Sequence, residues 1–310
     1  DINLAYLSGF KRIDDKSTVA MSLKFFSLGD ITFTDDQGNS LGNYRPSEFS
    51  IDGAYARKFS ERFSGAVTAR FIYSNLTQGQ SVAGQSTKPG TSIATDVAVY
   101  HTQPLSINGL KSANFDWGIN ISNIGSKISY SNDDQAKDFI PTNFRIGTSF
   151  GIDIDDYNSF RFSLDLNKLL VPTPPIYAQD TLGNPVYDDS GNQVIAKDEN
   201  GNDLGMDPNV SVMQGMIQSW YDAPGGFSEE MKEFIWVLGA EYWYDKQFAV
   251  RAGYFHESKM KGGRQFFTLG AGLRYNVFGL DFSYLIPTEQ QNPLQNTLRF
   301  TLTFDFAGIE

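Results

Sequence analysis

The sequence lacks several residues on which large classes of protein depend. It contains no cysteine, which excludes disulfides, thiolate-bound metals and thiol catalysis. Its two histidines leave little for a histidine-rich metal site. Basic residues are also scarce, because 25 lysines and arginines stand against 36 acidic residues, giving a formal net charge of −11. That charge repels phosphate backbones, so we expect no nucleic-acid partner.

Long apolar runs are absent as well. A membrane-spanning helix needs about 20 consecutive apolar residues, whereas the longest apolar stretch here runs only from Phe234 to Ala240. The mean hydropathy of −0.32 would suit a water-soluble protein. A membrane β-barrel gives a similar average, however, because its apolar and polar positions alternate.

What the sequence does contain is alternation with a period of two. Between Phe160 and Asn167, Phe and Leu alternate with polar residues, and Leu298 to Phe306 repeats the pattern. Side chains alternate across a strand, so each segment has one apolar and one polar face. We count about thirteen such segments, each of a length suited to tilted membrane strands. They begin near Ile2, Thr18, Glu48, Phe63, Ser92, Asn114, Asn143, Asn158, Phe234, Gln247, Arg264, Gly279 and Asn296.

The connections between these segments alternate between short and long. A soluble sandwich requires no such alternation and usually has shorter strands, whereas an outer-membrane barrel has short turns at one rim and long loops at the other. The predicted fold class is therefore all-β, a transmembrane antiparallel β-barrel of the outer membrane with long extracellular loops. The long connections are expected at roughly 29–46, 77–90, 124–141, 169–232, 259–263 and 287–295, and 103–112 is longer than the other short turns.

Strand parity adds an expectation about the start of the chain. If the last strand ends at the periplasmic rim, the first of thirteen strands begins at the cell-surface rim, where such barrels seldom begin. An even strand number is also typical. We therefore expect a single β-barrel domain over 1–310 that is N-terminally incomplete, about fourteen strands in the complete barrel, and residues 169–232 as a long extracellular loop.

The polar faces of the segments carry charges of both signs. Lumen positions tolerate charge, whereas the lipid face does not. Mixed signs predict a salt-bridged, partly filled lumen rather than an ion filter of one sign. The residues expected to face inward are Lys24, Arg57, Arg70, Asp96, Arg145, Arg161, Asp165, Glu241, Arg251, Arg274, Asp281, Arg299 and Asp305.

No motif predicts a catalytic, cofactor or metal site. Residues 147–151 satisfy the G-x-S-x-G pattern of hydrolases but lie inside an alternating strand, without the strand-to-helix turn that the mechanism requires. A D-x-x-G-N-x-[VL] unit recurs at 35–41, 180–186, 188–194 and 198–204, where Asp, Asn and Gly favour hairpin turns. The stretch 198–209 has Asp203 and Asn209 where a calcium-binding EF-hand needs Gly and Glu. We expect no enzyme and no cofactor.

The long loop at 169–232 is the segment most informative about function, because unstructured loops of this length are usually functional or disordered. Its second half carries apolar residues outside any membrane strand, and these require burial against something. Covering the barrel mouth and docking into a partner are both open interpretations. The candidate partner-binding residues are Val210, Val212, Met213, Met216, Ile217, Trp220, Tyr221 and Phe227.

Several stretches together resemble one known family, the PorV outer-membrane proteins of the Bacteroidetes type IX secretion system, which are related to the FadL fatty-acid channels. The match spans nearly the whole chain. The stretches are FSLGDITF at 26–33, NISNIG at 120–125, LNKLLVPTP at 166–174, DAPGGFSEE at 222–230, RAGYFHE at 251–257 and NTLRF at 296–300.

The resemblance implies a non-enzymatic role in protein secretion at the outer membrane. It implies binding to the SprA/Sov-type translocon barrel and covering of its lateral opening. Secreted proteins would be received through their C-terminal signal domains and handed over to a PorU-type sortase. Membrane lipid and lipopolysaccharide would surround the barrel. The alternative is a FadL-like channel for hydrophobic small molecules, against which the charged inward faces count.

Overall fold

The protein is dominated by one antiparallel sheet of thirteen strands, in which the spatial order of the strands follows the chain. The computed structural model describes residues 2–34, 37–80, 86–131, 137–288 and 297–306. The strands of this sheet are β1 (Asn3–Arg12), β2 (Ser17–Ser27), β5 (Ser47–Lys58), β6 (Phe63–Asn75), β7 (Gly90–Leu105), β8 (Ser112–Gly125), β9 (Asn143–Asp153), β10 (Asn158–Leu169), β11 (Ile235–Tyr244), β12 (Phe248–His256), β13 (Gln265–Tyr275), β14 (Phe278–Pro287) and β15 (Leu298–Phe304).

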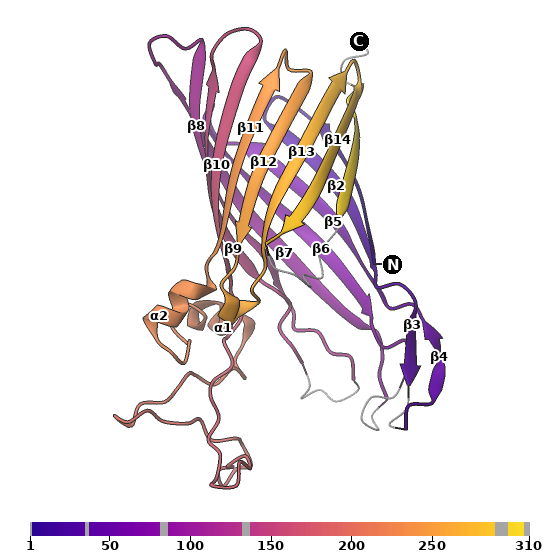
Figure 1. Ribbon diagram of the computed structural model, residues 1–310, viewed down its shortest axis with the longest axis vertical. Coiled ribbons are helices and arrows are strands. Elements are labelled where there is room, and N and C mark those ends of the chain that lie inside the picture. The colour runs from indigo at the N-terminus through magenta and orange to yellow at the C-terminus, as the bar shows by residue number, and fades with distance from the viewer. Residues whose placement is uncertain (1, 35–36, 81–85, 132–136, 289–296, 307–310) are drawn as a thin grey trace.

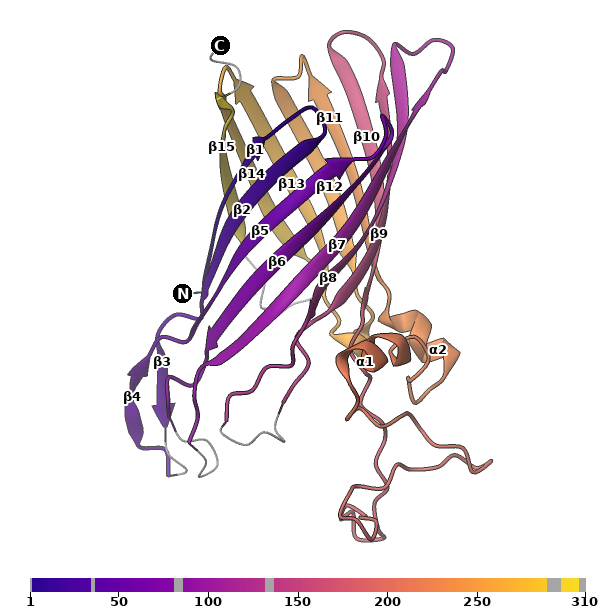
Figure 2. The ribbon, with the colours of Figure 1, turned by 180° about the vertical axis from the view of Figure 1, so that it is seen from behind.

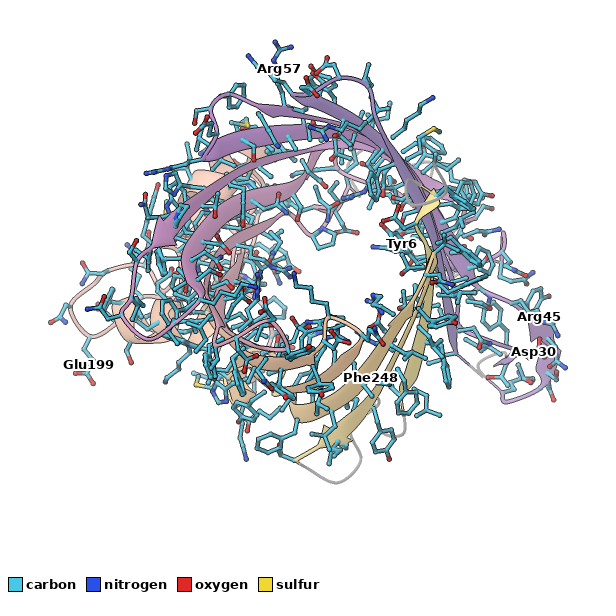
Figure 3. The ribbon with its side chains drawn as sticks, turned by 90° about the horizontal axis from the view of Figure 1, so that it is seen from above. Tyr6, Asp30, Arg45, Arg57, Glu199 and Phe248 are labelled. Carbon is cyan, nitrogen blue, oxygen red and sulfur yellow. The ribbon has the colours of Figure 1, made fainter. Side chains whose placement is uncertain are left out.

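The predicted strands are confirmed, and each begins within two residues of the expected position. The strands curve around a central space when seen from above (Figure 3). β1 and β15 end the sheet on its two sides and do not pair with each other in the part of the chain that the structure describes. The fourteenth strand therefore stays a prediction. Among the described residues, no helix is long and apolar enough to span a membrane.

The two faces of the sheet differ in the way that the alternation predicts. In β10, Arg161 and Ser163 line a cavity inside the ring, whereas Phe162 between them is half exposed on the outer face. Leu238 and Val250 are likewise exposed on the outside. This distribution, with large apolar side chains outside and charges inside, is that of a barrel embedded in lipid.

Arg57 corrects the predicted inward set. Its side chain lies outside the ring of strands (Figure 3) and donates a hydrogen bond to the Tyr55 hydroxyl at 3.3 Å. Arg57 pairs with Ser17 at the last rung of the ladder between β2 and β5. At this height, beside the turns, an outward cation reaches water and headgroups, so the cost that excludes charge from mid-membrane positions does not apply.

The connections separate into two ends, as Figures 1 and 2 show. Short turns join the strands at one end, for instance through Asp245 and Lys246, which both have positive φ. The long connections gather at the opposite end, including a hairpin of β3 (Ile31–Thr34) and β4 (Ser40–Tyr44) and the helices α1 (Val212–Gln218) and α2 (Phe227–Glu230). The expected alternation of short turns and long loops is thus present.

One long connection folds back onto the inner wall of the barrel. Ile128 and Ile140, from the segment 126–142, are buried together with Ala94 of β7. Tyr130 donates a hydrogen bond to Ser74 of β6 at 2.8 Å. The described parts of this connection, 126–131 and 137–142, therefore occupy part of the mouth at the long-loop end.

Residues 176–204, which we call the arm, project away from the barrel (Figures 1 and 2). Two closed rings of backbone hydrogen bonds hold the arm together. Ala178, Val194 and Val186 each donate to the next, at 2.8–3.1 Å, and Ile176, Leu204 and Ala196 form a second such ring at 2.8–3.0 Å. The long loop is therefore not structureless.

The three tips of the arm are the predicted D-x-x-G-N turns. At each tip the aspartate carboxylate accepts from backbone N–H groups two and four residues later, as at Asp188, where the distances are 2.9 and 2.8 Å. Gly191 takes a φ of +83°, which L-residues rarely adopt. The fourth copy includes 35–36, which lie outside the described residues.

Candidate docking site

Helix α1 divides the candidate residues into a packed side and an exposed side. Ser211 caps the helix by accepting a hydrogen bond from the Gln214 N–H at 3.3 Å. Gly215 and Met216 are buried, whereas Met213 and Ile217, four residues apart, are each 62 % exposed. Residues separated by four lie on one helical face, and the following turn extends it. We call the exposed set Met213, Ile217, Trp220 and Tyr221 the docking stripe.

Gly215 is what allows α1 to lie so close to the barrel mouth. A Cβ atom at this position would lie 2.8 Å from the ring of Phe139 and 3.0 Å from Pro172. Phe139 belongs to the segment 126–142, and the ammonium group of Lys127 lies 4.1 Å from the centre of its ring. The helix therefore packs on the segment that occupies the mouth.

Trp220 fixes the position of the stripe relative to the barrel wall. Lys168 of β10 pairs with Phe144 of β9, and the neighbouring Asn167 pairs with Ile235 of β11. One row across the sheet therefore contains Phe144, Lys168 and Phe234. Lys168 has the parity of the outward residues of β10. The Trp220 ring lies 5.4 Å from that of Phe144 and 6.2 Å from that of Phe234. Trp220 thus covers the outside of the wall.

Lys168 is fully buried, although it stands on the outer face of a strand. Its ammonium group pairs with Glu230 at 3.0 Å and with Glu233. Lys261 joins the same group through Glu229 at 2.6 Å and Glu233 at 2.8 Å. We call these five residues the clasp. They compensate a cation that would otherwise stand unpaired at the edge of an apolar surface, where charge is costly.

The carboxylates of the clasp also hold the returning backbone. Glu230 accepts from the Ala223 N–H and Glu229 from the Gly225 N–H, each at 2.8 Å. Hydrogen bonding from Lys261 lowers the pKa of Glu229. Burial raises the pKa of Glu233, but hydrogen bonds from Lys168, Lys261 and Thr173 outweigh it, so the net pKa is lowered. Glu229 and Glu233 therefore stay ionised around neutral pH.

Asp222 lies beside the clasp and behaves differently. One carboxylate oxygen accepts from the Thr173 N–H at 3.0 Å, and the other is buried without a hydrogen-bond partner in the described structure. Burial, assisted by the charges of Glu230 and Glu233, raises the pKa of Asp222 to about 6. Asp222 is thus the group of this site that titrates nearest to physiological pH.

The candidate residues do not all occupy the same environment. Met213, Ile217, Trp220 and Tyr221 come together as the stripe, and Phe227 is 78 % exposed at the start of α2. Met216 is buried and supports α1 from beneath, while Val210 and Val212 are half-buried. Their role in docking stays a prediction. The short helix α2 follows Asp222 in the chain.

Two exposed apolar residues near the stripe were not among the candidates. Met231, which follows α2, is exposed, and so is Met260 in the connection after β12. The Lys232 ammonium group lies 3.5 Å from the Met260 sulfur. Isolated methionines in short connections have no periodicity, so the sequence offered no signal for them.

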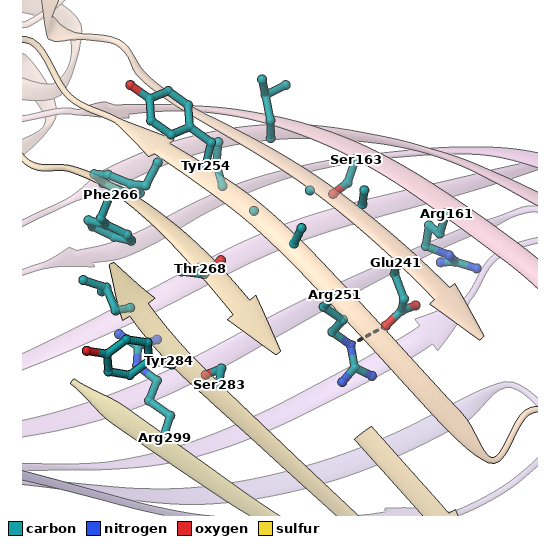
Figure 4. A pocket seen from close by; sticks show the side chains of 18 of the residues that line it. Arg161, Ser163, Glu241, Arg251, Tyr254, Phe266, Thr268, Ser283, Tyr284 and Arg299 are labelled. Carbon is teal, nitrogen blue, oxygen red and sulfur yellow. Dashed lines mark hydrogen bonds and ion pairs between the residues drawn. The ribbon is translucent and has the colours of Figure 1, made fainter. Parts of the chain in front are cut away.

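The inner face of the barrel carries the predicted ion pairs. Arg70 pairs with Asp52 at 2.6 Å and with Asp96 at 2.9 Å. Across the ring, Arg251 pairs with Glu241 and Asp281 and borders a cavity of about 550 Å³, which Figure 4 shows. Phe266 and Tyr254 also line this cavity. No cluster of metal-ligating residues occurs among the residues that the structure describes.

Comparison with known proteins gives one match. The family model described as type IX secretion system protein PorV matches residues 1–176, more than half of the 310-residue chain. A search of curated proteins finds no match. The matched region covers β1 to β10 and ends as the arm begins, before the docking stripe.

Proposed function

The chain belongs to the PorV family of type IX secretion system proteins, and we propose that it works there, without enzymatic activity, as a lateral partner of the translocon barrel. In this proposal the docking stripe binds the SprA/Sov-type translocon and helps to cover its lateral opening. The observation that carries the proposal is the contact of Trp220 with the outer row Phe144, Lys168 and Phe234. It sets an exposed apolar surface beside the wall.

The geometry favours a partner that lies in the same membrane. A surface on the outer wall meets a neighbour that approaches sideways, whereas a soluble ligand of the lumen would meet the inner face. Apolar and aromatic residues are the usual centres of protein interfaces, and Met and Trp are enriched there. The stripe combines both, with the aromatic ring anchored by packing.

We further propose that the long loops face the cell surface and receive cargo there. The arm and the β3–β4 hairpin reach outward beyond the ring of strands, as Glu199, Asp30 and Arg45 show in Figure 3. Such projecting elements would meet the C-terminal signal domains of secreted proteins and pass them to a PorU-type sortase. The rings of hydrogen bonds in the arm support a fixed rather than a fluctuating reach.

The proposal is tested by affinity purification from native outer membrane in a mild detergent. The variant Met213→Asn/Ile217→Asn makes the stripe polar at two largely exposed positions, so the barrel should still fold. We expect loss of a very large barrel protein and of cargo from the eluate, and a secretion defect. The matched control is Ile13→Asn in the short turn between β1 and β2, at the opposite end of the barrel, where the side chain is 59 % exposed. Unchanged recovery and secretion with the double variant would refute the docking role.

A FadL-like channel is the second candidate, favoured by the cavity of about 550 Å³ at the inner wall. Its lining includes Phe255, Phe266 and Leu285, which would suit an acyl chain. The ion pairs of Arg251 in the same lining weigh against it. A purified barrel that carries stoichiometric bound lipid in native mass spectrometry, with no barrel partner, would favour the channel.

A further inference from the structure

The charges and the apolar groups beside α1 differ in burial. Lys168, Glu230 and Glu233 of the clasp are almost entirely covered. The docking stripe, by contrast, is exposed and carries no charged residue. An element that faced water would be expected to show the reverse arrangement, with its charges outside.

The stripe continues an apolar surface that already belongs to the barrel wall. One row further along the strands, Ile146, Leu166 and Trp236 are paired across β9, β10 and β11 and share the outward parity. Adjacent outward residues of a strand are about 7 Å apart, so Trp236 lies directly beyond the row that Trp220 covers. Trp236 is itself exposed, as is Leu238 after it.

We infer that the docking stripe is seated in the headgroup region of the lipid bilayer whenever no protein occupies it. Trp and Tyr concentrate where an apolar ring meets wet headgroups, and Trp220 and Tyr221 stand at the end of the apolar wall. A helix whose apolar face is buried at this depth lies in the plane of the interface. The occupant is lipid, because the stripe is continuous with the lipid-facing wall.

This inference concerns the unoccupied state, so it stands whether or not the stripe also binds the translocon. It also explains why the charges of the clasp are buried and paired. A lysine at the edge of the lipid-facing surface would be costly if it were unpaired, and the two glutamates and the covering Trp220 and Phe234 rings remove that cost. It also predicts that partners exchange with lipid rather than with water.

The absence of native cysteine allows a direct measurement. The variant Ile217→Cys is labelled with a nitroxide and the full chain is reconstituted into dioleoylphosphatidylcholine vesicles. Collision of the label with oxygen, which concentrates in lipid, is compared with collision with a water-soluble nickel chelate. The controls are Leu238→Cys on the barrel wall and Leu182→Cys at an arm tip, both at exposed positions.

We expect the Ile217 label to resemble the Leu238 label, with oxygen collisions exceeding those of nickel, and the Leu182 label to show the reverse. An Ile217 label that is as accessible to nickel as the Leu182 label would overturn the inference. So would protection from both reagents at every protein-to-lipid ratio, because protein and not lipid would then cover the label. Met213→Cys repeats the test one turn away if the first label disturbs α1.

Discussion

The long loop after β10 contains two regions that are stabilised in different ways. The first, residues 211–234, which we call the cap, is fastened to the barrel by buried charges and by Trp220. The arm, residues 176–204, is held by its own backbone rings and aspartate turns and projects from the barrel. The same loop thus contains the cap, which depends on contacts with the barrel wall, and the arm, which is held by its own hydrogen bonds. Perturbing either should leave the other intact.

Removing the central cation should produce the largest effect. Lys168→Met leaves Glu230 buried without an ion-pair partner and leaves Glu233 with Lys261 alone, which we expect to destabilise the cap by about 3–5 kcal/mol. Hydrogen exchange should rise across residues 211–234 and stay unchanged in the arm. The control Lys197→Met removes an exposed pair with Asp203 at 3.5 Å, worth about 0–1 kcal/mol. Equal exchange in both variants would contradict the assignment of the clasp.

Truncating the aromatic anchor should come next. Trp220→Ala removes the contact with Phe144 and Phe234, and because the ring is partly exposed we expect a loss of about 2 kcal/mol, below the range for a fully buried Trp. Limited proteolysis should then cleave the cap sooner, with the strands still resistant. Trp220→Phe keeps part of the contact, so its cleavage rate should lie between those of the wild type and the Ala variant. An unchanged cleavage rate in the Ala variant would mean that the clasp alone holds the cap.

Opposite responses to pH should separate the two regions further. Burial raises the pKa of Asp222 to about 6 from its ordinary value of 3.8, so the folded cap binds a proton that the unfolded cap has already lost. Its contribution to stability is present below pH 3.8 and is lost as pH rises through about 6. The protection of the cap amides, measured as the exchange rate relative to the intrinsic rate at each pH, should therefore fall between pH 4 and pH 6.5, and Asp222→Asn should abolish that fall.

The tips of the arm should respond in the other direction. A hydrogen bond from the Asn184 N–H, with others nearby, lowers the pKa of Asp180. That contribution is present above the ordinary value of 3.8 and is lost as pH falls through the lowered pKa. The protection of the amides at the tips, relative to their intrinsic exchange rate, should fall only in acid. A cap and an arm that loosen over the same pH range would contradict both assignments.

The smallest effect is expected at a single turn. Asp188→Ala removes the acceptor of the Ser190 and Asn192 N–H groups, which are exposed and can bond to water instead, so we expect a small loss of stability confined to that tip. Amide exchange at 190–192 measures it. The matched control is Asp189→Ala, because the turn hydrogen bonds are accepted by the neighbouring Asp188. A global change in the arm would show that the rings do not hold it independently.

The strands were predictable because their signal is local. A period of two is visible within each segment, and it located even the start of β9 at Asn143 and of β10 at Asn158. The candidate docking residues were chosen by composition, as apolar groups outside a strand. Composition alone does not show that Met216 faces inward and Ile217 faces outward. That difference arises from helix α1, a short helix that is stabilised by packing on Phe139.

The clasp was not predicted, although one signal for it exists. Leu164, Leu166 and Lys168 share one face of β10, so a charge ends an apolar stripe. Its partners Glu230 and Glu233 lie more than sixty positions away, and no local pattern links such distances. The outward position of Arg57 was not predicted either. Alternation within a strand does not show how far a residue lies from the middle of the membrane, and near the rim a charge is tolerated on the outer face.

The backbone rings of the arm have a consequence for unwanted association. At Ala178, Val186 and Val194 each N–H and each carbonyl is used inside a ring of three, and the same holds at Ile176, Ala196 and Leu204. A closed ring has no open edge, so at these positions the arm offers no template onto which a foreign strand could add. An extended element held by isolated β-bridges can thereby stand apart from the barrel without offering an open strand edge at these positions.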